Sequence, residues 1–230
     1  MSTIYLIRHG QASLGSANYD QLSERGHAQA RVLARALAPA LSRPHAVFSG
    51  AMQRHQQTAQ TFFEALQRPT QWQTDARWNE FDHEAVICAF RPEYADHARM
   101  MRDLLAAPDP RKAFKDLFIG SVMRWASGAH DADYAETLPA FHARCRAALA
   151  DLGAELPPTQ DALVFTSGGP IGAIVLAVQN PADAGEFLRR WRHANCGVTR
   201  LIQNGDGANL QALNDHAHFS GEDAELLTFT

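Results

Sequence analysis

The chain has 230 residues, of which 46% are hydrophobic and 20% charged, the balance of a globular protein rather than a disordered or membrane-embedded one. Its net charge of -4 argues against a protein built mainly to hold nucleic acid, so local arginines must attract any phosphate. This length suits one domain over residues 1–230, with room for an insertion.

The cysteine and histidine patterns predict neither a disulfide framework nor a metal site. Cys88, Cys145 and Cys196 are scattered and form no C-x-x-C pair, as expected of reduced thiols in the cytoplasm. His216-x-His218 lacks a third ligand at a known spacing. No apolar run approaches the ~20 residues of a membrane helix, and an immediate strand leaves no room for a signal peptide. We therefore expect a cytoplasmic protein without a membrane partner.

The first predicted element is a short buried strand over residues 4–7, which ends in Arg8, His9 and Gly10. Ligands bind beyond the carboxyl ends of strands in open α/β sheets, and a glycine there lets the backbone approach an anion closely. Arg8 and His9 are therefore candidate anion contacts. The alternative is an ordinary strand end with a surface histidine and arginine.

Alternating helical and strand patterns follow. They predict a helix from the N-cap Ser23 down to Leu41, a strand at 46–48, a helix at 53–66 and a strand at 70–76. Arg54 lies in the first turn of the second helix, where a cation opposes the helix dipole. A bound anion would remove that conflict, although a solvated arginine is the alternative.

Residues 84–155 have no clear strand pattern and predict helices near 92–106, 111–127 and 137–153. We expect this helical insertion to cover the site. Beyond it, the sequence predicts a strand at 162–166, a helix at 171–178, a helix from Asn180-Pro181 to about 193 and a β-hairpin at 198–213. The whole pattern predicts a three-layer α/β/α fold with a mainly parallel central sheet and an antiparallel edge strand.

Five motifs occur in order between residue 4 and about residue 175. They are Arg8-His9-Gly10, Asp20-x-Leu22-Ser23-x-x-Gly26-x-x-Gln29-Ala30, Ser49-x-x-x-x-Arg54-x-x-Gln57-Thr58-Ala59, Trp78-Asn79-Glu80-Phe81-Asp82 and Thr166-Ser167-Gly168-Gly169. This set resembles the histidine phosphatase superfamily, the phosphoglycerate-mutase-like proteins. The set in this order is far more specific than any single member.

The resemblance implies a phosphohydrolase that acts through a phosphohistidine on a small phosphorylated substrate. It implies that His9 is the nucleophile and Glu80 the proton donor. It further implies a set of phosphate-binding residues: Arg8, Arg54, Ser167, Gly168 and Gln11. Arginines grip phosphoryl oxygens bidentately and supply positive charge, so we expect no metal and no cofactor. The resemblance leaves the oligomeric state open, and a homo-oligomer is one of the family's forms.

The proposed chemistry makes demands on two pKa values. His9 must be neutral to attack, and the flanking arginines disfavour its cation. Glu80 needs a raised pKa to serve as an acid, so we expect it to be partly buried among apolar neighbours such as Trp78 and Phe81.

The sequence departs from the family pattern at Ser167, where members usually carry a second histidine that donates to the phosphoryl group. A serine hydroxyl brings one hydrogen bond and no charge, although the Gly168 and Gly169 amides at a helix N-terminus compensate in part. Loss of one preorganised donor costs roughly 10²–10³ in rate, so weak activity is one expectation. Ala12 and Gly15 replace residues of the mutase-like members, which counts against mutase activity.

Three alternatives remain. The first is a phosphate-binding protein with a degenerate catalytic site, which the change at Ser167 motivates and the retained Glu80 opposes. The second is a phosphoglycerate-mutase-like phosphotransferase. The third is a serine hydrolase, which would need a small residue two positions before Ser167, where this chain has Phe165.

Overall fold

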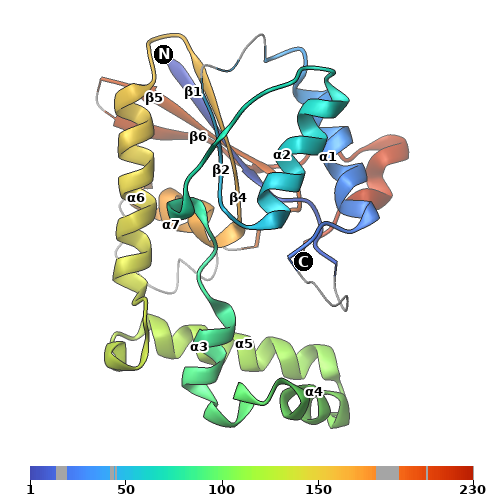
Figure 1. The fold of residues 1–230 in the computed structure, drawn as a ribbon, viewed down its shortest axis with the longest axis vertical. Helices are drawn as coiled ribbons and strands as arrows, with labels where there is room; N and C mark the ends of the chain where they lie inside the picture. The colour runs from blue at the N-terminus through green and yellow to red at the C-terminus, as the bar shows by residue number, and fades with distance from the viewer. Residues whose placement is uncertain (14–19, 42–43, 45, 180–191, 206, 230) are drawn as a thin grey trace. The chain divides into compact units, whose positions relative to one another are not determined.

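A computed structural model describes residues 1–13, 20–41, 44, 46–179, 192–205 and 207–229 of the protein (Figure 1). The chain divides into two units. The first contains Met1–Glu80 and most of the chain from Arg144 onward, and the second contains Phe81–Ala143.

The first unit is built on a six-stranded sheet in the order β3-β2-β4-β1-β5-β6. The strands are β1 (Ser2–Arg8), β2 (Ala46–Ser49), β3 (Gln73–Thr74), β4 (Asp161–Thr166), β5 (Val198–Asn204) and β6 (Gly207–Asp215). The four strands from β3 to β1 are parallel, whereas β5 pairs antiparallel with both β1 and β6. The predicted parallel sheet with an antiparallel edge is confirmed.

Helices cover both faces of this sheet, which confirms the three-layer fold. Figure 1 shows α1 (Glu24–Leu37) and α2 (Gln53–Ala65) together on one side, with α7 (Gly168–Gln179) on the other. On the α1–α2 side, Ile7 of β1 and Phe165 of β4 belong to the same buried cluster as Leu33 and Phe62.

Central strands are buried on both faces. Tyr5 and Ile7 belong to the cluster under α1 and α2, while the alternating residues Ile4 and Leu6 of β1 are completely buried outside that cluster. A strand covered on both faces is the pattern of a parallel α/β sheet, and it explains the near-continuous apolar sequence of β1.

Unit 2 consists of helices, with no strand among its described residues. They are α3 (His83–Phe90), α4 (His97–Ala106), α5 (Pro110–Ala126) and the first residues of α6 (Leu138–Glu155). The rings of Phe81, Trp125 and Phe141 contact one another, with centroid distances of 4.8 Å for Phe81–Trp125, 5.6 Å for Phe81–Phe141 and 5.8 Å for Trp125–Phe141. The predicted helical character of the insertion is confirmed, and its place over the site remains a prediction. In the described parts of the chain, no helix combines the length and the apolarity that crossing a membrane requires.

Several predicted boundaries differ from the structure. Helix α3 was not predicted, because its eight residues are too few for a clear period, although Asp82 caps it by accepting a hydrogen bond from the Ala85 N–H at 2.9 Å. The strand predicted at 70–76 shrinks to β3, and the helix predicted at 92–106 begins only with α4 after a 3₁₀ turn. Most of the helix predicted from residue 180 to about residue 193 lies outside the described residues.

The turn after β1 packs against the start of α1 at van der Waals distance. A Cβ on Gly26 would lie 2.3 Å from the carbonyl oxygen of Gln11, and one on Gly10 would lie 2.5 Å from the carbonyl oxygen of Gly26. Ser23 caps α1, because its Oγ accepts the Gly26 N–H at 3.1 Å. These two glycines therefore let the turn and the helix come into backbone contact.

We predict that Gly26→Ala destabilises the protein, although alanine normally favours a helix over glycine. The added methyl group would overlap a backbone carbonyl, and such overpacking costs about 1–3 kcal/mol. Urea denaturation of the wild type and the variant measures the change. Gly205→Ala is the matched control, since a Cβ there meets no atom within 4 Å. A Gly26→Ala variant as stable as the wild type would contradict the packing argument.

Candidate active site

The predicted nucleophile and the predicted Ser167 turn lie at the same edge of the sheet. In the parallel pairing of β1 with β4, Arg8 is opposite Thr166. The His9 N–H continues this ladder by donating to the Thr166 carbonyl at 2.9 Å. His9 and Ser167 therefore follow neighbouring strands at their carboxyl ends, where open α/β sheets bind ligands.

Three hydrogen bonds with two other segments of the chain hold the backbone of the Arg8-His9-Gly10 turn. The Cys196 N–H donates to the Arg8 carbonyl at 3.0 Å, and Asn195 Nδ2 donates to the His9 carbonyl at 3.2 Å. The Gly10 N–H donates to Thr58 Oγ1 at 3.1 Å. The turn is thus fixed by α2 and by the segment before β5, as a preorganised site requires.

His9 is held as a neutral imidazole with a defined tautomer. Its Nδ1 is 2.7 Å from the carbonyl oxygen of Gly10, and because a carbonyl only accepts, Nδ1 carries the proton. The lone pair is therefore on Nε2. Burial, followed by the charges of Arg54 and Arg8 and the effect of His55, lowers the pKa of His9 well below its ordinary value of 6.5. His9 is therefore neutral at pH 7, and its role as the nucleophile stays a prediction.

Both predicted arginines are buried, and each has a defined partner. Arg8 Nη1 donates to the His193 carbonyl at 2.5 Å. Arg54 Nη1 pairs with Asp20 Oδ1 at 2.8 Å, while Asp20 Oδ2 accepts the Gln53 N–H at 2.8 Å at the start of α2. A carboxylate thus binds where the Arg54 guanidinium and the helix N-terminus both favour an anion.

Glu80 reaches the turn that follows β4. Its Oε2 accepts the Gly169 N–H, in the first turn of α7, at 3.0 Å. The segment before Glu80 is fixed by Arg144, whose Nη1 donates to the carbonyls of Arg77 and Asn79 at 2.8 Å each. Glu80 is partly buried, as expected. Its role as a proton donor stays a prediction.

Ser167 has a partner that the sequence did not predict. Its Oγ is 2.6 Å from Nε2 of His55, and both side chains are completely buried. The His55 ring lies 5.6 Å from the His9 ring between centroids. Burial and the neighbouring Arg54 lower the pKa of His55 well below 6.5. In the sequence, the feature that could have pointed to His55 is its position next to Arg54, within the motif from Ser49 to Ala59.

The two remaining predicted phosphate contacts, Gly168 and Gln11, lie in different surroundings. Gly168 is the first residue of α7 and is buried at the turn. The side chain of Gln11 lies toward α1: its Oε1 accepts from Ser23 Oγ at 3.3 Å, while the Gln11 N–H donates to Gln29 Oε1 at 2.8 Å. The structure therefore assigns Gln11 a place at the N-terminus of α1, and its contact with phosphate stays a prediction.

The residues around His9 are arginines and a second histidine rather than a set of metal ligands. Within the described ranges, no three His, Cys, Asp or Glu side chains cluster so that they could hold a metal ion.

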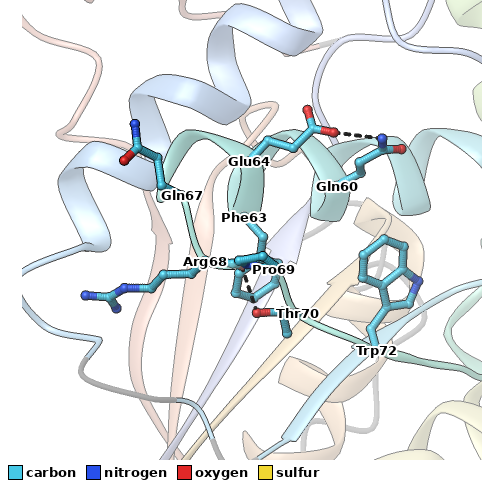
Figure 2. Close-up of a pocket in the computed structure, with 8 residues that line it drawn as sticks. All are labelled: Gln60, Phe63, Glu64, Gln67, Arg68, Pro69, Thr70 and Trp72. Carbon is cyan, nitrogen blue, oxygen red and sulfur yellow. Dashed lines mark hydrogen bonds between the residues drawn. The ribbon is translucent and has the colours of Figure 1, made fainter.

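A cavity of about 340 Å³ lies elsewhere, at the C-terminal end of α2 (Figure 2). Figure 2 shows Trp72 and Phe63 beside it, with the Gln60–Glu64 hydrogen bond of 2.8 Å on its helical wall. None of the predicted site residues lines this cavity. The candidate active site is therefore at the carboxyl edge of the sheet and not in this cavity.

Solved structures similar to this chain include phosphatases and a mutase. A mycobacterial glucosyl-3-phosphoglycerate phosphatase in complex with inorganic phosphate is 22% identical, with a TM-score of 0.61, covering 95% of this chain and 99% of its own. A phosphoserine phosphatase from Entamoeba histolytica in complex with phosphoserine is 15% identical, with a TM-score of 0.62 and coverage of 96% and 100%. A phosphoglycerate mutase from Bacillus anthracis is 15% identical, with a TM-score of 0.62 and 94% coverage of both chains.

At these identities, the structural similarity establishes the fold. A comparison of the sequence with curated proteins finds no match. The family model of the histidine phosphatase superfamily (branch 1), in contrast, matches residues 4–216. This match spans the His9 turn, the Arg54 motif, Glu80 and the Ser167 turn, so the chain belongs to branch 1 of the histidine phosphatase superfamily.

Proposed function

We propose that this protein is a phosphomonoesterase that transfers the phosphoryl group of a small substrate to Nε2 of His9. The observation that carries this proposal is the state of His9, which is neutral, protonated on Nδ1 and flanked by two buried arginines. A neutral imidazole with a free Nε2 lone pair is a nucleophile, and two guanidiniums match the oxygens of a transferring phosphoryl group.

The proposed reaction has two steps. His9 Nε2 attacks phosphorus, the bond to the leaving oxygen breaks, and Glu80 gives that oxygen its proton. Glu80 then removes a proton from water, which attacks the phosphohistidine and breaks the P–N bond, so that His9 and the protonated Glu80 are regenerated. Arg8 and Arg54 bind the equatorial oxygens in both steps, and the scheme uses no metal and no cofactor.

In the structure, two carboxylates contact donors that would bind a phosphoryl group in this proposal. Asp20 pairs with Arg54, and Glu80 accepts the Gly169 N–H at the start of α7. Carboxylate and phosphoryl oxygens are recognised by the same donors, so substrate binding in this proposal replaces these contacts. Gly168 and Ser167 then contribute to the same anion site, and Gln11 lies at its margin.

The names of the similar structures support a phosphorylated small molecule as substrate, because two of them are phosphatases of such compounds. We propose that the insertion over residues 84–155 selects among substrates. The remaining partner assignments are proposals of the same kind: action in the cytoplasm, no nucleic acid or membrane partner, and a homo-oligomer as one form of the protein.

Ser167 favours one competing function, a phosphate-binding protein without useful turnover. A buried serine bound to a neutral histidine brings no charge to a phosphoryl group. The mutase-like alternative differs in the fate of the phosphoryl group, which would return to an organic hydroxyl rather than to water. Release of inorganic phosphate therefore separates the proposed phosphatase from both of these alternatives.

We predict that His9→Ala abolishes hydrolysis of an aryl phosphate assayed without added metal. Removal of a nucleophile leaves only binding and electrostatic stabilisation, so kcat should fall by roughly 10³-fold or more. Inorganic phosphate release measures the rate. His27→Ala is the matched control, since His27 is a partly buried histidine on α1 that contacts Thr61. Wild-type turnover that survives His9→Ala would contradict the proposal.

We predict that the acid limb of kcat/KM lies below pH 6.5. Because the pKa of His9 is lowered in the folded protein, its Nε2 becomes protonated and inactive only well below that pH. The profile is measured with an aryl phosphate and corrected for the second ionisation of the substrate. A corrected limb at or above pH 6.5 is the outcome that this account does not allow.

A further inference from the structure

The hydrogen bond between His55 and Ser167 is a polar contact to which the proposed reaction assigns no role. The two atoms involved, His55 Nε2 and Ser167 Oγ, are 2.6 Å apart, and the residues belong to α2 and to the turn before α7. Both are completely buried, beside His9. Completely buried polar side chains at a functional edge need a reason, because their desolvation is costly.

Ser167 is not needed as a helix cap. Its carbonyl accepts the Ile171 N–H at 3.3 Å, which places it at the N-cap of α7, where a serine Oγ usually accepts an amide of the first turn. Here Pro170 has no N–H, and the Gly169 N–H is bound by Glu80. Ser167 Oγ is instead bound to His55, so its hydroxyl serves the site rather than the helix.

Gly50 identifies the tautomer of His55. A Cβ on Gly50 would lie 2.2 Å from His55 Nδ1, so a Cα hydrogen of the glycine points at that nitrogen. A lone pair tolerates this weak C–H donor, whereas an N–H would clash with it. Nδ1 is also buried without a hydrogen-bond partner among the described residues, and buried orphan N–H groups are rarer than orphan acceptors.

The proton of the neutral ring is therefore on Nε2, which donates to Ser167 Oγ. Ser167 then keeps its own O–H for another acceptor, and no described residue other than His55 shares a hydrogen bond with its side chain. Ser167 is the first residue after β4, and β4 pairs with β1, so Ser167 lies next to the end of β1 that His9 follows.

We propose that His55 is a positioning residue that holds Ser167 so that the Ser167 hydroxyl donates a hydrogen bond to the phosphoryl group on His9. This inference rests on the proposed phosphohistidine chemistry. It differs from a serine nucleophile with His55 as its base, which would require the proton on Nδ1. It also explains why Gly50 and Ser167 occur with His55. The glycine leaves space for the imidazole ring, and the serine hydroxyl oxygen accepts the hydrogen bond from Nε2–H.

The test compares four variants on an aryl phosphate: His55→Gln, His55→Phe, Ser167→Ala and the double variant His55→Phe/Ser167→Ala. Glutamine keeps a donor close to the position of Nε2 but cannot act as a base, whereas phenylalanine fills the space without a donor. We expect His55→Phe and Ser167→Ala each to lower kcat by roughly 10²-fold, the typical loss for one preorganised donor. His55→Gln should lose less than tenfold in kcat, and the thermal midpoint should change little in all four variants.

The double variant should lose no more kcat than either single one, because both remove the same hydrogen bond. Equal losses in His55→Gln and His55→Phe would overturn the donor assignment in favour of a base. Unchanged kcat in His55→Phe or Ser167→Ala would overturn the proposal as a whole.

Failure of the proposed function is a separate result, seen as wild-type turnover that is absent or insensitive to His9→Ala. Calorimetry with inorganic phosphate then tests the pair directly. Binding weakened by tenfold or more in His55→Phe and Ser167→Ala, but not in His55→Gln, would support the hydroxyl as a phosphate donor. Equal binding in all variants, or no binding by the wild type, would overturn it.

Discussion

The parallel pairing of β1 with β4 is the constraint on which the site depends. Because Arg8 is opposite Thr166, His9 and Ser167 leave the sheet side by side. The hydrogen bond from the His9 N–H to the Thr166 carbonyl extends that register by one step. A slip of one residue would turn every side chain of β1 to the other face of the sheet and would move His9 out of its place opposite the residue that follows Thr166.

The second determinant is the burial of that edge. Burial alone disfavours a charged imidazole, and Arg8 and Arg54 act in the same direction. The same environment strengthens the attraction of the arginines for an anion. The carboxylates of Asp20 and Glu80 accept from Arg54 and from the Gly169 N–H, which shows that these donors bind anionic oxygens. In the proposed function, one arrangement thus keeps the His9 imidazole neutral and provides the positive charge that a phosphoryl group needs.

Most of the fold was predictable, because short apolar runs such as β1 and β4, bounded by turn residues and alternating with helical patterns, are typical of buried strands in an α/β sheet. The sequence also predicted that three residues belong to the candidate site, because each lies at a strand end or at a helix start. These residues are Arg8, His9 and Arg54. Helix α3 was not predictable, because eight residues show too little periodicity. The strand predicted at 70–76 failed because only two of its residues find a partner in β2.

His55 shows why a site is harder to predict than a fold. Its importance arises from Ser167, which is 112 positions away in sequence, and from the space beside Gly50. No local pattern records either contact. The departure at Ser167 was visible in the sequence, but a serine alone suggested only a lost donor. Its partner in α2 makes it part of a buried pair instead.

The measurement that tests the central claim most directly is the position of the phosphoryl group on the protein. Stoichiometric protein is mixed with an aryl phosphate and quenched in base, which preserves phosphohistidine, and the modified residue is located by tandem mass spectrometry and ³¹P NMR. The account predicts phosphate on Nε2 of His9, because Nδ1 is protonated and bound to Gly10. Phosphate on Ser167, or on Nδ1 of His9, would contradict it.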